Sequence, residues 1–103
     1  MSMKTIDSQV FNTNQSWCLE EMLNLNGKKL HIYIRKNAYD FQSYGDISLW
    51  SGDKWNCIHR IPGESLAIKR SYVEKDVTAV DFIADRKRLL TIAKAILESQ
   101  ERS

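Results

Sequence analysis

The stretch DISLWSGDKWNCIHRI, residues 46–61, decides the fold of this chain. It reads as two strands, residues 46–50 and 55–61, joined by the turn sequence Ser51-Gly52-Asp53-Lys54. A glycine at the first central position of a two-residue loop is typical of a type II′ turn, whose twist matches that of the flanking strands. The turn places Trp50 opposite Trp55, and an aromatic cross-strand pair of this kind stabilises a hairpin by about 0.5–1.5 kcal/mol.

The turn also predicts the register of the rest of this hairpin. Counting back from it pairs Leu49 with Asn56, Ser48 with Cys57, Ile47 with Ile58, and Asp46 with His59. One face of the hairpin is then apolar, and the other carries the two tryptophans together with polar side chains.

Upstream, residues 17–25 allow two interpretations. As a helix capped by Ser16, the segment would gather Cys18, Leu19, Met22 and Leu23 on one face. As a strand, it leads into Asn26-Gly27, the strongest short signal for a hairpin. We favour the strand because the turn is followed by clean alternation, with Leu30, Ile32 and Ile34 against His31, Tyr33 and Arg35.

Downstream, Pro62-Gly63 marks a turn, and residues 66–73 read as a further strand. The main helix lies within residues 78–97, where apolar residues recur at spacings of three, four and seven. This apolar stripe consists of Phe82, Ile83, Leu89, Leu90, Ala93, Ile96 and Leu97. The helix starts either near Thr78, which with Asp81 resembles a capping box, or at Asp85 after a last strand over residues 77–84.

These elements predict an α+β fold: an antiparallel sheet of about four to six strands, with one long C-terminal helix packed on one face. The 103 residues fit a single domain, 1–103. Residues 1–10 and 99–103 are polar, and we expect them to be loosely ordered.

Charge and cysteine content narrow the class of protein. The net charge of +2, from 15 basic and 13 acidic residues, falls short of the strongly basic character of a dedicated DNA-binding module. Cys18 and Cys57 form no disulfide framework. The chain has no long apolar run typical of a signal peptide or a membrane span. We therefore expect a cytoplasmic protein with two free thiols.

Alternation divides the predicted sheet into two unlike faces. The face for the helix carries Leu30, Ile32, Ile34, Ile47, Leu49 and Ile58. The opposite face carries His31, Tyr33, Arg35, Asp46, Trp50, Trp55, Cys57 and His59. This second face is too aromatic to be merely solvated and too polar to be an ordinary core, so it is the candidate binding surface. Its candidate binding residues are Tyr33, Arg35, Trp50, Trp55, His31 and His59.

The composition of this face suggests a non-enzymatic binding module with a macromolecular partner, foremost a protein, because Trp, Tyr and Arg dominate interface hot spots. The alternative partner is single-stranded RNA or DNA, whose bases stack on aromatic rings while Lys28, Lys29, Lys36 and Arg60 hold phosphates. A third interpretation is that the face is covered, by the chain itself or by a second copy in a homodimer.

No pattern in the sequence predicts catalysis, a metal or a cofactor. Cys57, His59, His31 and Cys18 lack the spacing of a zinc site. Cys57, His59 and Asp46 are neighbours in the expected register, but strand residues two apart seldom reach hydrogen-bond distance, so we expect no activated nucleophile. A helix starting at Asp85 would bring Arg86, Lys87 and Arg88 to its N-terminus as an anion site; a solvated basic helix face is the simpler interpretation.

Overall fold

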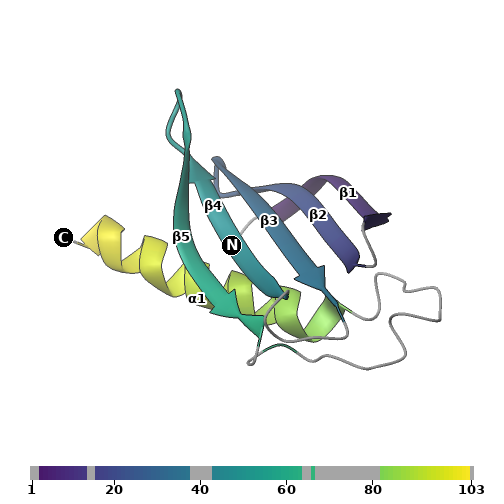
Figure 1. The fold of residues 1–103 in the computed structure, drawn as a ribbon. Coiled ribbons are helices and arrows are strands. Elements are labelled where there is room, and N and C mark those ends of the chain that lie inside the picture. The colour runs from purple at the N-terminus through teal and green to yellow at the C-terminus, as the bar shows by residue number, and fades with distance from the viewer. Residues whose placement is uncertain (1–2, 14–15, 38–42, 64–65, 67–81, 103) are drawn as a thin grey trace.

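The computed structural model describes residues 3–13, 16–37, 43–63, 66 and 82–102. Five strands precede one helix along the chain (Figure 1). They are β1 (Met3–Thr13), β2 (Ser16–Leu25), β3 (Lys28–Lys36), β4 (Tyr44–Trp50), β5 (Trp55–Pro62) and α1 (Ile83–Arg102).

The strands form one antiparallel sheet in the order β1-β2-β3-β4-β5, so every strand pairs with its neighbours in the sequence. Helix α1 crosses one side of this sheet and packs on β3, β4 and β5 (Figure 1). The predicted α+β fold is therefore confirmed, with the helix on one face of the sheet.

The first ambiguity is resolved in favour of the strand, because residues 16–25 form β2 and pair with β3 along their length. Asn26 and Gly27 have φ angles of 53° and 84°, the positive values that a type I′ hairpin turn requires at both central positions. The side chain of Asn24 supports the turn, since its Oδ1 accepts a hydrogen bond of 2.8 Å from the Gly27 N–H.

The β4–β5 hairpin keeps the predicted register only near its turn. Trp50 pairs with Trp55, Leu49 with Asn56 and Ser48 with Cys57, as predicted. The next two predicted pairs are wrong, because a β-bulge at Ile58 shifts the register: Ile47 pairs with His59, and Asp46 with Arg60.

The sequence of β5 explains the bulge. Ile58 and Ile61 are three residues apart, so a regular strand would place them on opposite faces of the sheet. The extra residue lets both approach the core: Ile61 is 1% exposed, and Ile58 is partly buried against the core cluster. The same shift moves His59 to the helix side of the sheet and Arg60 to the opposite side.

Strand β1 was not predicted as a strand. Residues 3–13 pair with β2 from end to end, with one irregularity between Thr5 and Asp7. Residues 3–9 are exposed, whichever side of the sheet they face. The strand therefore carries no apolar alternation, which is the signal that identifies half-buried strands.

The core lies between the sheet and α1. Its sheet side includes Leu19, Leu23, Leu30, Ile32, Ile34 and Ile47, and its helix side includes Phe82, Leu89, Leu90, Ala93 and Leu97. The helix begins at Ile83, between the two predicted starts, and Asp85 lies in its first turn instead of capping it. Ile83 is 57% exposed, so its assignment to the buried stripe was wrong.

Charged side chains are also buried where α1 meets the sheet. The Nζ of Lys36, at the end of β3, lies 2.7 Å from Oδ2 of Asp85, and these side chains are 0% and 2% exposed. The Lys36 ammonium also lies 5.1 Å from the ring centroid of Phe82. Glu21 on β2 is also buried and pairs with Arg86, whose side chain is 26% exposed. These ion pairs join the start of the helix to the helix side of the sheet.

Some expectations lie outside the described residues. The predicted strand over residues 66–73 is described only at Leu66, which is buried and donates a backbone hydrogen bond of 3.1 Å to Gly63 O. The predicted capping box of Thr78 and Asp81 also lies outside them. Within the described part of the chain, no helix combines the length and apolar character needed to cross a membrane.

Candidate interaction surface

The candidate surface is the side of the sheet opposite α1, here called the outer face. Five of the six predicted binding residues lie on it. His31, Tyr33 and Arg35 alternate along β3, and Trp50 and Trp55 face each other at the end of the β4–β5 hairpin. The sixth, His59, pairs with buried Ile47 and lies on the helix side, so its placement on this surface was wrong.

The tip of the β4–β5 hairpin carries the most exposed rings of this surface. Trp50 and Trp55 are each 38% exposed, and their ring centroids lie 5.2 Å apart at a tilt of 57°. The hairpin extends beyond the rest of the sheet (Figure 1). Gly52, with φ of 100°, supplies the positive φ that the tight connection needs. Both indoles are therefore accessible while their geometry is fixed by the strands.

Polar groups hold the ring of His31 beside this pair. Its centroid lies 5.5 Å from that of Trp55, and its Nε2 lies 3.2 Å from Oε2 of Glu20 on β2. Gln9 on β1 donates a hydrogen bond of 3.2 Å to the other oxygen of Glu20. The ammonium of Lys29 lies 6.0 Å from the Trp55 ring centroid. These contacts form a chain of side chains from β1 to β5 across the outer face.

A second aromatic group lies at the other end of the same face. Tyr33 and Tyr44 have ring centroids 5.6 Å apart, and the guanidinium of Arg60 lies 4.2 Å from the Tyr44 centroid. The Tyr33 hydroxyl lies 3.3 Å from the buried Sγ of Cys18. Burial, reinforced by this hydrogen bond, raises the pKa of Tyr33 well above its ordinary value.

One carboxylate lies between these two groups. Asp46 pairs with Tyr33 on one side and with Arg60 on the other. Burial raises the pKa of Asp46, while its electrostatic interactions with Arg60 and then His31 act in the opposite direction. The outer face therefore mixes both signs of charge around its rings.

Sequence reasoning missed Tyr44, because the strand was expected to begin at Asp46. Extending the alternation of Asp46, Ser48 and Trp50 back by two residues would have found it. It also missed the place of Arg60, which only the bulge brings to the outer face.

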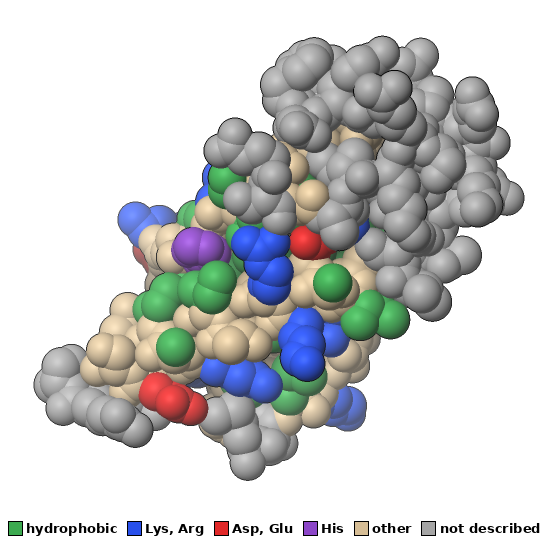
Figure 2. Space-filling model, turned by 90° about the horizontal axis from the view of Figure 1, so that it is seen from below, with side chains coloured by type: hydrophobic (Ala, Val, Ile, Leu, Met, Phe, Trp, Pro, Cys, Tyr) green, Lys and Arg blue, Asp and Glu red, His purple; other side chains and the backbone are tan. Residues whose placement is uncertain are grey.

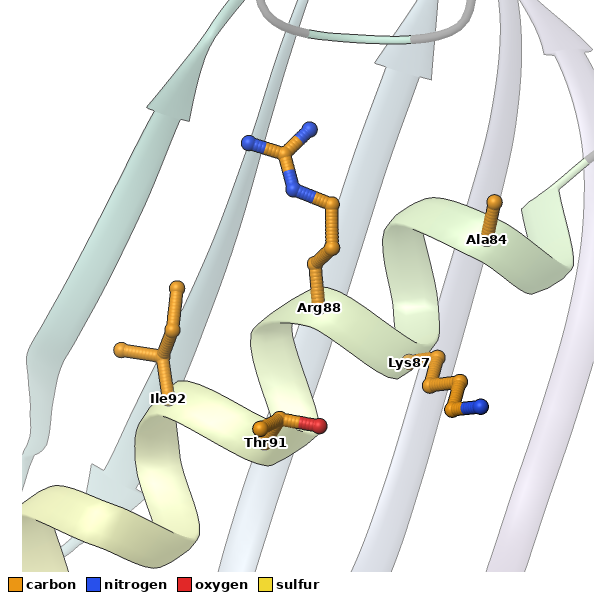
Figure 3. Close-up of a pocket in the computed structure, with 5 residues that line it drawn as sticks. All are labelled: Ala84, Lys87, Arg88, Thr91 and Ile92. Carbon is orange, nitrogen blue, oxygen red and sulfur yellow. The ribbon is translucent and has the colours of Figure 1, made fainter.

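A different surface feature lies on the exposed side of α1. A groove of about 400 Å³ is lined by Ala84, Lys87, Arg88, Thr91 and Ile92 (Figure 3). Arg88 and Ile92 project to one side of the helix and Lys87 and Thr91 to the other, so their polar groups do not converge (Figure 3). Seen from below, Lys and Arg side chains are interspersed with apolar ones over the described surface (Figure 2).

Metal ligands and an activated thiol are the two kinds of chemistry that the His and Cys side chains could supply here. Within the described ranges, no three His, Cys, Asp or Glu side chains converge as metal ligands. The hydrogen-bonding contact of the Cys57 thiol is to the backbone oxygen of His59, 3.6 Å away, and not to the imidazole. Arg86, Lys87 and Arg88 lie in the helix that starts at Ile83, where Arg86 pairs with Glu21 and Arg88 lies 3.7 Å from Asp85.

Comparison of the chain with protein-family models, with curated proteins and with solved structures finds no match. The outer face is therefore the feature of the molecule that bears on its function.

Proposed function

We propose that this protein is a non-enzymatic interaction module that binds a protein partner through its outer face. The observation that carries the proposal is the pair of Trp50 and Trp55, each 38% exposed and in tilted ring contact at the end of a projecting hairpin. Rings held in place by strands lose little conformational entropy on binding, and Trp, Tyr and Arg are the residue types that dominate interface energetics.

The charges on the outer face support a protein partner more than a polyanion. Lys29 and Arg60 lie over aromatic rings, but Glu20 and Asp46 lie on the same face. Phosphates would meet these carboxylates, whereas a protein surface can present both signs of charge to them. The proposal includes a cytoplasmic location, where Cys18 and Cys57, which form no disulfide, remain thiols.

A pair of variants tests the outer face. Trp50→Thr with Arg60→Ala removes one exposed ring and one exposed cation, and threonine keeps the strand propensity of the site. Lys87→Ala with Arg88→Ala on α1 serves as the control, because both residues are exposed and lie away from the outer face. Thermal unfolding of all proteins checks that the fold is kept.

Quantitative affinity capture from native lysate then compares the three proteins. We expect partners recovered by the wild type and the control to fall at least about tenfold with the outer-face variant, the effect of losing about 1.4 kcal/mol. Equal recovery by all three proteins would remove the outer face as the binding surface.

A specific feature favours single-stranded nucleic acid as the second candidate. The ammonium of Lys29 over Trp55 and the guanidinium of Arg60 over Tyr44 combine stacking surfaces with cations. Fluorescence anisotropy with mixed RNA and DNA oligomers tests it. Binding that weakens linearly in log–log plots against salt would support this candidate, and no binding at low salt would exclude it.

A further inference from the structure

The two edges of the sheet are built differently. β5 is interrupted by the bulge at Ile58 and ends at Pro62, which has no backbone N–H to donate. β1 has eleven residues and no proline, and its only irregularity lies between Thr5 and Asp7. The run Asp7–Thr13 therefore has an unbroken register and a regular row of backbone groups that point away from β2.

Most of β1 is left uncovered by the rest of the described chain, although Val10 and Phe11 are half-buried and Val10 packs against the core cluster. Residues 3–9 are exposed, with Met3 at 41% and Ile6 at 54%. Helix α1 packs mainly on β3, β4 and β5 and also reaches β2 through the Arg86–Glu21 ion pair. Natural proteins usually blunt such an edge with charges, proline or a covering element, and β1 carries only Lys4 and Asp7 as charged residues.

We propose that β1 pairs antiparallel with β1 of a second copy of this chain, joining two five-stranded sheets into one continuous sheet. This proposal is independent of the function proposed for the outer face. Along two antiparallel strands, hydrogen-bonded residue pairs alternate with non-hydrogen-bonded pairs. Pairs related by a two-fold axis must be of the same type, so the axis has to pass through a residue that pairs with its own copy. The centre of the unbroken run is Val10.

The sequence around Val10 is complementary to itself in this register. Gln9 lies opposite Phe11 of the second copy, Ser8 opposite Asn12, and Asp7 opposite Thr13. No two like charges oppose one another, and the two valines at the axis form a β-branched pair of the kind that suits strands. The β1 strand of a second copy also has the same length as the edge that it pairs with, whereas a strand of another protein need not.

The blunted β5 edge limits the assembly to two copies. Since the bulge and Pro62 interrupt pairing there, the sheet does not extend further, and a closed two-fold dimer results instead of a filament. The axis is perpendicular to the sheet, so both helices lie on one side and both outer faces on the other. The dimer therefore presents two pairs of Trp50 and Trp55 in the same direction.

Two matched variants test the pairing and its register. Ser8 and Asn12 are both exposed, so their substitution leaves the core intact. Ser8→Lys with Asn12→Lys places like charges opposite each other twice at the axis. Ser8→Lys with Asn12→Glu places opposite charges there twice. Thr91→Lys with Ala95→Lys on the exposed side of α1 adds the same charge as the first variant at a distance from β1.

Sedimentation equilibrium measures the dimer dissociation constant of each protein. We expect dimers for the wild type, the opposite-charge variant and the α1 control, and at least about tenfold weaker association for the like-charge variant. A monomeric wild type would overturn the proposal. A like-charge variant that dimerises as tightly as the wild type would place the interface elsewhere, and equal loss in both β1 variants would refute the register centred on Val10.

Discussion

Removing the ammonium of Lys36 is a direct test of how the helix is joined to the sheet. Lys36→Met keeps the approximate length and apolar stem of the side chain but leaves Asp85 without its partner at 2.7 Å. Asp85 is only 2% exposed, so water cannot replace the ammonium. Arg88 stays 3.7 Å from the other carboxylate oxygen and offers partial compensation.

The expected loss follows from that burial. Breaking a buried ion pair by removing one partner costs about 3–5 kcal/mol, and the contact with Arg88 favours the lower end of this range. A loss of about 3 kcal/mol lowers the equilibrium constant for folding more than a hundredfold. For a domain of this size it lowers the melting temperature by about 12–24 °C.

Urea denaturation followed by tryptophan fluorescence measures the free energy of unfolding. The companion variant, Lys36→Met with Asp85→Leu, removes both charges. Its free energy of unfolding should lie within about 1 kcal/mol of the wild-type value, since apolar replacements of a buried ion pair often leave stability unchanged. If Lys36→Met costs less than about 1 kcal/mol, or if the double variant is less stable than the single one, the reasoning fails.

Three further predictions concern a turn, a carboxyl group and the hairpin tip. Gly27→Ala forces an alanine to a φ of 84° and should lower the free energy of unfolding by about 1–2 kcal/mol. Asn26→Gly, at a φ of 53°, should not lower it. Thermal melts in which Asn26→Gly is the less stable variant would contradict this prediction. Because burial raises the pKa of Asp46, its folded form holds the proton more tightly, so this contribution to stability is complete below the ordinary pKa of 3.8 and is lost as pH rises through the raised value. Asp46→Asn should therefore lose less stability than the wild type between about pH 4 and neutrality, and parallel pH profiles would show that Asp46 plays no such part. A double-mutant cycle of Trp50→Leu and Trp55→Leu should give a coupling free energy of about 0.5–1.5 kcal/mol in denaturation experiments, and additive losses would mean that the rings do not interact.

The sequence predicted those parts of the fold that depend on local pattern. Turn chemistry identified the β2–β3 and β4–β5 hairpins, since Asn26-Gly27 and Gly52 supply the positive φ angles that these connections need. Alternation then identified the buried side of β3 and the outer face with Tyr33.

The parts that could not be predicted depend on tertiary contacts. The bulge at Ile58 satisfies burial of both Ile58 and Ile61, a compromise that counting along a regular strand cannot show. Because the bulge adds one residue to β5, His59 lies on the helix side of the sheet and Arg60 lies on the outer face. β1 was not predicted because residues 3–9 are exposed on both sides of the sheet, so no alternation of apolar residues marks them as a strand.

The burial of Lys36 and Glu21 could have been predicted from the alternation of the sequence. Continuing the alternation of Leu30, Ile32 and Ile34 by two residues places Lys36 on the helix side, and Glu21 stands between Leu19 and Leu23 in the same way. A charged residue at a core position predicts a buried partner. Its identity, Asp85 or Arg86, could come only from the docked helix.

The strictly sequential strand order has a consequence for how the chain folds. Each hairpin pairs segments that are adjacent in the sequence, so the sheet can form by closing one short loop after another. Docking of α1 instead joins the last 20-residue element to strands formed much earlier. During synthesis, at about 5–20 residues per second, the apolar side of β3 and β4 stays uncovered for seconds until α1 is made. The nascent sheet, before its helix arrives, is therefore the stage at which this chain is most exposed to aggregation and to chaperone binding.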